Sequence, residues 1–369
     1  MAATYQFGIE EELFLADAET RSTPKHVEPF HRAVRDRMPT VERELLVSQV
    51  EIMTQPCTDF AAARSSLSEL RQGLAAIGRE HGILVLGGGS HPIARWRRQE
   101  RTDKERYDKI ADDLQMLAER DVVSGMHVHV EVPDPGRRVD LMNRLLPHTP
   151  LLFALSASSP FWEGHATGLN AYRLSVWGEM PRTGLPELFA DAAEYDRLVD
   201  TMVRCGAVED ASYFWWTMRP SIRFPTLELR VADSCTRLDD TLAIAALYRC
   251  LVRHADRDPG HNARLTSVSR AVASENMWRA QRDGVGAVFV QEEGGAIAFA
   301  DLLWEVLATV AEDADALGCQ AELERARTIA SEGTSADRQL TIFSDARTKG
   351  SDADALKSVV DWMAEATAA

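Results

Sequence analysis

The segment GIEEELFL places three consecutive glutamates inside an apolar stretch. Successive side chains of a strand point to opposite faces, so Glu10 and Glu12 would lie on one face, about 7 Å apart. Glu11 would point away, and would be either structural or a support for the residues that bind the metal. Two carboxylates on one face repel each other and lose solvation when buried. A divalent cation removes both penalties, and Mg²⁺ or Mn²⁺ prefers hard oxygen ligands. An exposed edge strand with an acidic face is the alternative interpretation of this stretch alone.

Three further strand-like stretches contain residues of the same kind. LLVSQVEIMTQP has the single glutamate Glu51, SGMHVHVEV has His127 and His129 two residues apart, and FPTLELRVAD has Glu228 and Arg230 two residues apart. A lone strand histidine is usually a core residue, and a lone strand glutamate is usually exposed. Four such stretches in one chain favour a shared sheet face that binds metal ions and phosphate.

Taken together, these motifs resemble the glutamine synthetase-like superfamily, and most closely the glutamate–cysteine ligase type 2 family of carboxylate–amine ligases. The stretches that carry the resemblance follow the chain from residue 7 to about residue 285: GIEEELFL, VEIMTQP, LGGGSHP, GMHVHV, NAYRLSVWG, RPSIRFPTLELRVAD and ENMWRAQRDG. The resemblance implies an α+β, glutamine synthetase-like catalytic fold. Its curved, mostly antiparallel sheet of about six strands would form a funnel flanked by helices.

The resemblance also implies roles for individual residues. The expected ligands of Mg²⁺ or Mn²⁺ are Glu10, Glu12, Glu51, His127 and Glu228. The residues expected at the nucleotide are His129, Arg230, Arg223 and Arg279, and those expected at the substrate are Arg173, Arg219, Ser90 and His91. Arg230 and Glu228 are the expected catalytic pair, with Arg230 stabilising the transferred phosphoryl group. The GGGSHP segment is expected to be a tight turn whose backbone approaches the substrate.

The activity implied by the resemblance is the ATP-dependent joining of a carboxylate to an amine through an acyl phosphate. The expected substrates are glutamate, reacting through its γ-carboxylate, and cysteine or another amine, with release of ADP and phosphate. One alternative is a guanido-kinase-like phosphotransferase on the same scaffold. Another is a metal-dependent hydrolase that uses His127 and His129, although the chain lacks the regular alternation of the β/α barrels in which such histidine pairs occur.

Composition narrows the classes of partner. The chain has 369 residues, is 45% hydrophobic, and carries a net charge of −16 with no polybasic run, which argues against nucleic acid and anionic membranes as partners. Five scattered cysteines without a zinc spacing, and no signal-peptide pattern or long apolar run, favour a cytoplasmic protein with free thiols. The expected partners are amino acid and amine substrates, and a homodimer is possible.

The elements that would position these residues alternate along the first three quarters of the chain. Apolar patterning predicts strands at 5–15, 46–53, 83–87, 125–132, 171–177 and 226–233. Helices are predicted at 59–81, ending at Gly82, and at 101–120 and 239–254. After about residue 296 the pattern is only helical, at 296–316, 318–331 and 353–367. We therefore expect a catalytic domain over 1–295 and a helical part over 296–369 packed on the same body.

Overall fold

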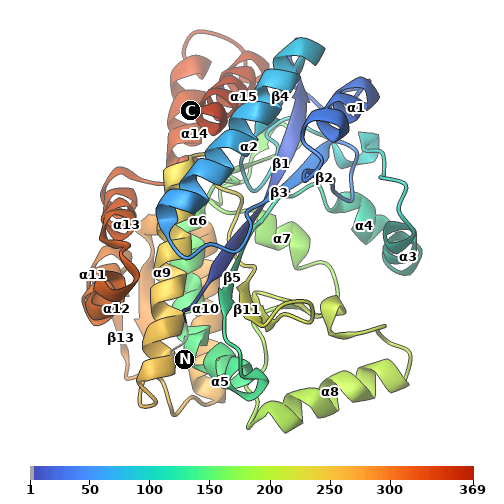
Figure 1. Ribbon diagram of the computed structural model, residues 1–369. Helices are drawn as coiled ribbons and strands as arrows, with labels where there is room; N and C mark the ends of the chain where they lie inside the picture. The colour runs from blue at the N-terminus through green and yellow to red at the C-terminus, as the bar shows by residue number, and fades with distance from the viewer. Residues whose placement is uncertain (1–3) are drawn as a thin grey trace.

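A seven-stranded antiparallel sheet forms the centre of the computed structural model, which describes residues 4–369 apart from the side chain of residue 106 (Figure 1). The strand order is β10-β11-β5-β1-β3-β2, and β4 also pairs with β1. The strands are β1 Phe7–Asp17, β2 Glu42–Arg43, β3 Gln49–Met53, β4 Ile83–Leu86, β5 Met126–Glu131, β10 Met218–Pro220 and β11 Thr226–Leu229. The predicted α+β class with a mostly antiparallel sheet is confirmed.

The first half of β1 shows why the two faces of the sheet differ. Its side chains alternate, so Phe7, Ile9 and Leu13 are buried on one face, while Glu10 and Glu12 lie on the other and are only partly buried. The apolar face packs beneath α2 (Phe60–His81) and α9 (Leu238–Arg257), both of which contribute to the same core. The charged face is not covered by these two helices and can therefore form a binding site.

Helix α2 begins and ends at the predicted signals. The Asp59 side chain accepts a hydrogen bond from the Ala62 amide at 2.9 Å, which caps the first turn. Gly82 ends the helix with a φ of 67°, a left-handed conformation that glycine adopts without a steric penalty. The prediction of a helix over 59–81 is confirmed.

The remaining helices of the first 295 residues surround the sheet, with α1 packed beside α2 and with α3, α4, α7 and α8 on the side away from α9 (Figure 1). The α-helices are α1 Glu28–Arg37, α3 Glu105–Leu114, α4 Met116–Arg120, α5 Pro135–Leu145, α6 Thr149–Ser156, α7 Arg173–Trp177, α8 Ala192–Arg204 and α10 Ser267–Asp283. Single 3₁₀ turns are η1 Trp96–Arg98, η2 Leu146–His148, η3 Ala211–Tyr213 and η4 Gly284–Gly286. Three two-stranded sheets add β6 Phe161–Trp162 with β7 His165–Ala166, β8 Thr183–Gly184 with β9 Trp215–Trp216, and β12 Val288–Gln291 with β13 Gly295–Ala298.

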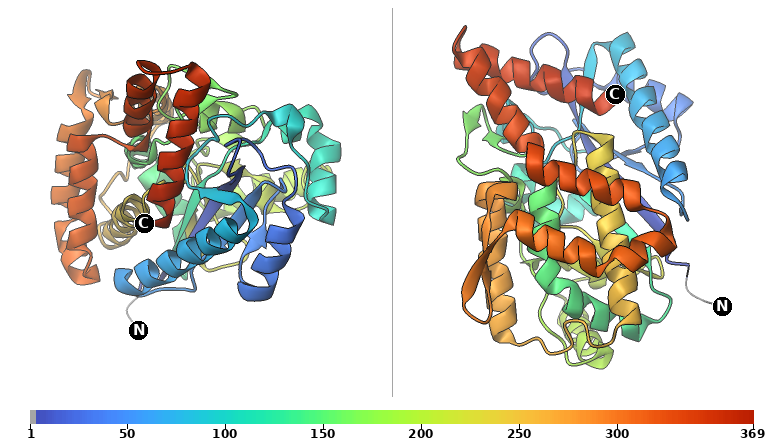
Figure 2. Two further views of the ribbon diagram at one scale, coloured as in Figure 1. Left: turned by 90° about the horizontal axis from the view of Figure 1, so that it is seen from above. Right: turned by 90° about the vertical axis from the view of Figure 1, so that its left-hand side faces the viewer.

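Five helices make up the C-terminal part, and they contact the first part of the chain (Figure 2). They are α11 Phe299–Thr309, α12 Ala311–Leu317, α13 Gln320–Glu332, α14 Ser335–Arg347 and α15 Asp352–Ala368. Helix α13 packs on α9, and α15 packs on β4 and α2. At the end of β4 the Gly87 amide donates a hydrogen bond to Thr367 Oγ1 at 2.8 Å. The domain boundary near residue 296 stays a prediction.

Two sequence-based expectations for local structure are wrong. The segment 171–177 is not a strand, because Arg173–Trp177 forms α7 and buries Arg173, Val176 and Trp177, a spacing of three and four that fits one helical turn. The region after residue 296 is not wholly helical, since β13 pairs with β12 before α11 begins. No helix among the described residues is long and apolar enough to cross a bilayer. The five cysteines are free thiols, as expected.

Candidate active site

The register of the sheet brings the glutamates of β1 and their neighbours onto one face. Glu12 lies opposite Glu51 on β3, and Glu10 lies opposite His127 on β5. Directly opposed residues of an antiparallel pair project to the same face of the sheet. The prediction that these stretches share a face is therefore confirmed for all four side chains.

The same face continues across β5 to β11. His129 lies opposite Glu228, and Glu228 lies opposite Arg219 on β10. Glu228 is 2% exposed and pairs with two guanidinium groups, from Arg230 and from Arg219, whose Nε lies 2.8 Å from Glu228 Oε2. Burial acts to raise the pKa of Glu228, but Arg230 and Arg219 outweigh it and hold the pKa well below its ordinary value.

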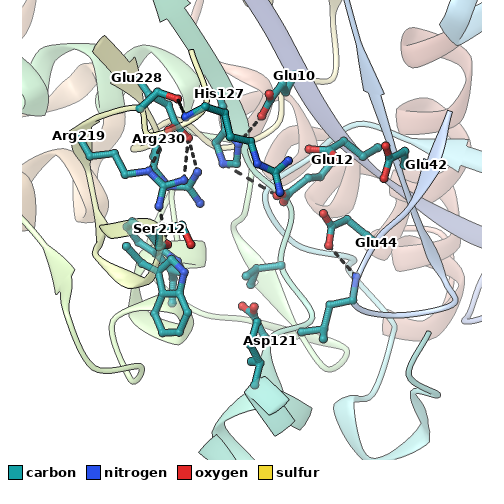
Figure 3. A pocket seen from close by; sticks show the side chains of 18 of the residues that line it. Glu10, Glu12, Glu42, Glu44, Asp121, His127, Ser212, Arg219, Glu228 and Arg230 are labelled. Atoms are coloured by element: carbon teal, nitrogen blue, oxygen red, sulfur yellow. Dashed lines mark hydrogen bonds and ion pairs between the residues drawn. The ribbon is translucent and has the colours of Figure 1, made fainter. Parts of the chain in front are cut away.

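These residues open onto one cavity of about 440 Å³ (Figure 3). Of the described residues, its carboxylates are Glu10, Glu12, Glu42, Glu44, Glu51, Asp121 and Glu228. Its cationic side chains are Lys104, Arg173, Arg219, Arg223 and Arg230, and its histidines are His127 and His129. Carboxylates outnumber cationic side chains here, so bound cations would balance the charge.

Two groups of side chains in this cavity have the donor set and spacing of a metal site. Glu10, His129 and Glu228 form one group, and Glu10, Glu51 and His127 form the other, with the ligand atoms within 4.8 Å of one another in each. Glu10 belongs to both groups. Carboxylate oxygens with one imidazole nitrogen suit Mg²⁺ or Mn²⁺, so the residues fit the expected metal.

The protonation states of Glu10 and His127 also suit metal binding. His127 Nδ1 lies 3.2 Å from Glu10 Oε2, and His129 Nε2 lies 3.3 Å from Glu10 Oε1. Burial, followed by the nearby Arg230, lowers the pKa of His127 to about 4, so the ring is neutral near pH 7. Burial acts to raise the pKa of Glu10, but the two imidazoles outweigh it, and the carboxylate stays ionised. A neutral imidazole beside an ionised carboxylate is what a metal needs.

Glu51 and Glu12 are two carboxylates of this face whose pKa is raised. Burial, followed by Glu44 and Glu10, raises the pKa of Glu51 well above its ordinary value. Burial and Glu44 raise the pKa of Glu12 to about 8, although its Oε2 accepts a 2.6 Å hydrogen bond from the Gly125 amide. A divalent cation near either carboxylate would reverse this shift, because it would favour the charged form.

The middle glutamate of the segment is directed to the other side of the sheet, as predicted. Glu11 is fully buried in the core, where its Oε1 lies 2.6 Å from Arg71 Nη2 and accepts a hydrogen bond from Thr241 Oγ1 at 2.6 Å. Arg71 also donates to the carbonyls of Cys235 and Thr236. The ion pair is structural and ties β1 to α2.

Three of the predicted site residues do not line the cavity. Ser90 and His91 are buried elsewhere, with Ser90 Oγ donating to Phe161 O and His91 Nδ1 accepting from the Ile93 and Ala94 amides. Arg279, on α10, pairs with Glu275 at 2.7 Å. The expected substrate and nucleotide roles of these three residues are therefore not carried further.

The glycines before Ser90 show why the GGGSHP segment does not approach a substrate, as the sequence analysis had expected. A Cβ on Gly87 would lie 2.6 Å from Cys235 O, and one on Gly89 would lie 2.4 Å from the Asp233 carboxylate. These glycines therefore allow close packing of the chain against itself rather than against a substrate.

Several cavity residues were missed by the sequence analysis. They lie outside the motifs and come from β2, the following loop and the α3–α4 region: Glu42, Glu44, Lys104, Tyr107 and Asp121. Glu42 and Glu44 are two residues apart, the same spacing as Glu10 and Glu12, which was the available signal. Asp121 follows a predicted helix, and no motif or spacing in the sequence around it indicates a place in the site.

Comparison with known proteins agrees with this geometry. Residues 6–361 match the family described as Glutamate-cysteine ligase family 2 (GCS2). A protein of Bradyrhizobium diazoefficiens named "Putative glutamate--cysteine ligase 2" is 45% identical over 99% of this chain and 85% of its own length. A protein of Rhodospirillum rubrum with the same name is 43% identical over 99% of this chain and 96% of its own length. The chain belongs to glutamate–cysteine ligase family 2.

Solved structures of low sequence identity share the fold. The glutamate–cysteine ligase of Francisella tularensis, solved in complex with AMP, has a TM-score of 0.69 at 12% identity, over 100% of this chain and 89% of that one. A bifunctional glutathione synthetase from Pasteurella multocida has a TM-score of 0.70 at 16% identity, over 98% of this chain and 52% of that one. These matches support the predicted fold class.

Proposed function

We propose that this chain is an ATP-dependent carboxylate–amine ligase that joins the γ-carboxylate of glutamate to the amino group of cysteine or another amine. Membership of glutamate–cysteine ligase family 2 supports the reaction class. The observation that carries the proposal is the shared sheet face, where Glu10 belongs to both candidate metal groups and Glu228 holds Arg230 beside them. Such a site suits phosphoryl transfer, which depends on positioning and on neutralising charge.

The metal ligands would be Glu10, Glu51, His127, His129 and Glu228, with Glu12 at the edge of the group. Bound Mg²⁺ or Mn²⁺ would supply charge neutralisation on the phosphates of ATP. Glu12 Oε1 lies 3.9 Å from His127 Nε2, and its other oxygen is held by the Gly125 amide. The protein thus holds these carboxylates in place before ATP arrives.

Arg230 is the residue that we assign to the transferred phosphoryl group. Its guanidinium lines the cavity, its Nη1 pairs with Glu228, and its buried Nε has no hydrogen-bond partner among the described atoms. The pairing orients the planar group, which can donate its remaining N–H groups to a phosphoryl oxygen. The substrate carboxylate attacks the γ-phosphorus, ADP leaves, and the amine then displaces phosphate from the acyl phosphate.

Arg219 and Arg223 have different positions within the cavity. Arg219 is occupied by Glu228 and by the Ser212 carbonyl, so it supports Glu228 rather than contacting substrate directly. Arg223 lies exposed on the loop between β10 and β11 at the cavity, where it can meet the nucleotide phosphates. His129 belongs to one of the candidate metal groups, and its Nδ1 lies 2.9 Å from Thr226 Oγ1 at the start of β11.

The test is release of ADP and phosphate with Mg-ATP and glutamate against a panel of amines that includes cysteine. Amine-dependent release, with a new amide detected by mass and lost in Glu228→Gln, would support the ligase. Release without any amine would point to a phosphotransferase instead. Failure of the protein to form an amide with any pair, although it binds Mg-ATP, would reject these substrates. A homodimer is a separate proposal, tested by light scattering.

A further inference from the structure

A second cavity, of about 360 Å³, is lined by α7 and α10 and lies outside the candidate active site. The end of α7, β8 with the residue that follows it, Thr217 and one face of α10 form this α7–α10 cavity. Trp177 is the only described residue that lines both this cavity and the main one, so its side chain lies at the boundary between them. The volume is near the lower end of the range, about 300–1,000 Å³, of cavities that bind small molecules.

The α7–α10 cavity differs from the main cavity in its charge. None of its described lining residues is a carboxylate, and Arg270 on α10 is the only cationic side chain among them. Arg270 Nε donates to Pro186 O at 2.9 Å, and its Nη2 donates to Leu185 O at 3.0 Å. These bonds fix the plane of the guanidinium, and Nη1 has no hydrogen-bond partner among the described atoms. The Nη1 group can therefore donate to an anion in the cavity.

Arg270 has one carboxylate partner, which lies outside the lining. Its Nη2 lies 2.9 Å from Glu187 Oε1, and the side chain of Glu187 is 64% exposed. An ion pair in contact with solvent is weak, so Glu187 leaves Arg270 able to bind a second carboxylate. Glu187 would compete with that carboxylate for the same guanidinium.

Two hydroxyl groups of the lining can bind the same ligand. Thr217 is 1% exposed, and its Oγ1 is buried without a hydrogen-bond partner among the described atoms. Ser274 on α10 adds an exposed hydroxyl to the lining. A buried hydroxyl without a partner is unfavourable, so a ligand with acceptor oxygens would stabilise Thr217 as well as Arg270.

Apolar side chains form another part of the lining. Leu185 is 8% exposed, and Met277 of α10 packs in the same small cluster. Leu174 and Trp177 line the cavity from α7. These side chains favour a ligand with a short apolar chain, because its binding would remove apolar surface from water.

We propose that the α7–α10 cavity binds a small monocarboxylate, whose carboxylate contacts Arg270 and whose apolar chain lies against Leu185 and Met277. A single guanidinium balances a single negative charge, whereas a phosphate ester would carry nearly two. An alkylammonium ion would be repelled by Arg270 and would meet no carboxylate among the described lining residues. This site is separate from the proposed ligase reaction and does not depend on it.

The probe is hexanoate, compared with hexan-1-ol and hexylamine, which have the same chain without the negative charge. Isothermal titration calorimetry of the whole protein measures each Kd, with and without glutamate, Mg²⁺ and a non-hydrolysable ATP analogue to fill the main cavity. We expect one hexanoate per chain under both conditions. Its Kd should be lower than that of either comparison compound by about tenfold or more, the effect of one hydrogen bond to a charged group.

Four variants test the contacts one by one. Arg270→Gln should abolish the preference for hexanoate over hexan-1-ol, and Thr217→Val should weaken hexanoate binding by about two- to tenfold. Glu187→Gln removes the competing carboxylate and should tighten hexanoate binding. Ser274→Trp introduces a large side chain from an exposed position, leaves the contacts of Arg270 in place, and should prevent binding.

The contrary results are equally specific. Hexan-1-ol that binds as tightly as hexanoate, or weaker hexanoate binding in Glu187→Gln, would overturn the assignment of the carboxylate to Arg270. Hexanoate that binds only while the main cavity is empty would place the probe there and overturn the second site, as would no saturable binding at all. Glu187 and Ser274 are exposed, so these variants keep the test valid even if Arg270→Gln does not fold.

Discussion

Glu11 Oε1 lies 2.6 Å from Arg71 Nη2 in a core where both side chains are almost fully buried, on the opposite face of β1 from Glu10 and Glu12. Three adjacent glutamates therefore have two different purposes. The outer two line a cavity that needs cations, and the middle one holds a helix against the sheet.

Replacement of Glu11 by Ala is expected to destabilise the fold by about 3–5 kcal/mol, because Arg71 would stay buried without its partner. Urea unfolding measures the change. The matched control is Glu80→Ala, which removes the exposed partner of Arg37 and should change the unfolding free energy far less, because solvent screens that pair. A double change of Glu11 and Arg71 to Met should recover part of the loss. An equal effect at Glu80 would contradict the structural role of the Glu11 pair.

Glu10 belongs to both candidate metal groups, which predicts two bound metal ions that share this ligand. With a non-hydrolysable ATP analogue, Glu10→Gln should weaken both Mn²⁺ sites, whereas Glu51→Gln should weaken one, since it belongs to only one group. Mn²⁺ titration followed by electron paramagnetic resonance counts the sites. Glu44→Gln is the control, because Glu44 lines the cavity and belongs to neither group. Loss of both sites in Glu51→Gln would argue for a single shared ion.

The assignment of Arg230 predicts a defect in catalysis rather than in folding. Arg230→Lys should lower kcat by about 10²- to 10³-fold, because lysine cannot pair with Glu228 and also donate a second, fixed N–H to the phosphoryl group. Steady-state kinetics with Mg-ATP measures it. Arg279→Lys provides the comparison, since Arg279 lies on α10 beside Glu275 and outside the cavity. An equal loss of kcat in the two variants would support the original prediction that Arg279 contacts the nucleotide.

A methyl group at residue 125 is expected to displace Arg173. In Gly125→Ala the new Cβ would lie 2.3 Å from Arg173 Nη2, and this buried guanidinium must shift. We expect kcat/KM for the ligase reaction to fall by about tenfold or more, because small misplacements in active sites commonly have effects of this size. Gly286→Ala is the control, because a Cβ there meets no atom within 4 Å. Unchanged kinetics in Gly125→Ala would show that the position of Arg173 is unimportant.

A histidine pair that does not line the cavity predicts that the stability of the fold decreases in acid. His148 Nε2 lies 2.9 Å from His261 Nε2, and burial, followed by His261 and His254, lowers the pKa of His148 to about 3. The unfolded chain binds this proton near pH 6.5 and the folded chain does not. The contribution of His148 to stability is therefore fully present above pH 6.5 and is lost as the pH falls toward 3, by up to about 1.4 kcal/mol per pH unit.

Urea unfolding at several pH values between 7.5 and 4.5 checks this expectation. The slope of unfolding free energy against pH should be smaller in His148→Gln than in the unaltered protein. The exposed His165 offers a matched replacement, His165→Gln, which should leave the slope unchanged. A slope that does not differ between the unaltered protein and His148→Gln would rule out the buried neutral histidine as its source.

The sequence by itself determined which residues could meet on one face. Strand periodicity placed Glu10 and Glu12 together and Glu11 apart, because the side-chain period of a strand is two residues and depends on no distant contact. Local capping signals likewise determined both ends of α2, through Asp59 and Gly82. The family motifs then named the chemistry that those faces could perform.

Only the tertiary structure decided which strands are neighbours and what the glycine-rich turn contacts. The register that sets Glu12 against Glu51 and Glu10 against His127 joins segments about 40 to 120 residues apart, and local patterns carry no record of such pairing. The short segment around Arg173 fits a strand or one helical turn equally well, and its packing decided for the helix. Asp121 lines the cavity because the tertiary structure places the end of α4 there. No property of the residues around Asp121 predicts that position.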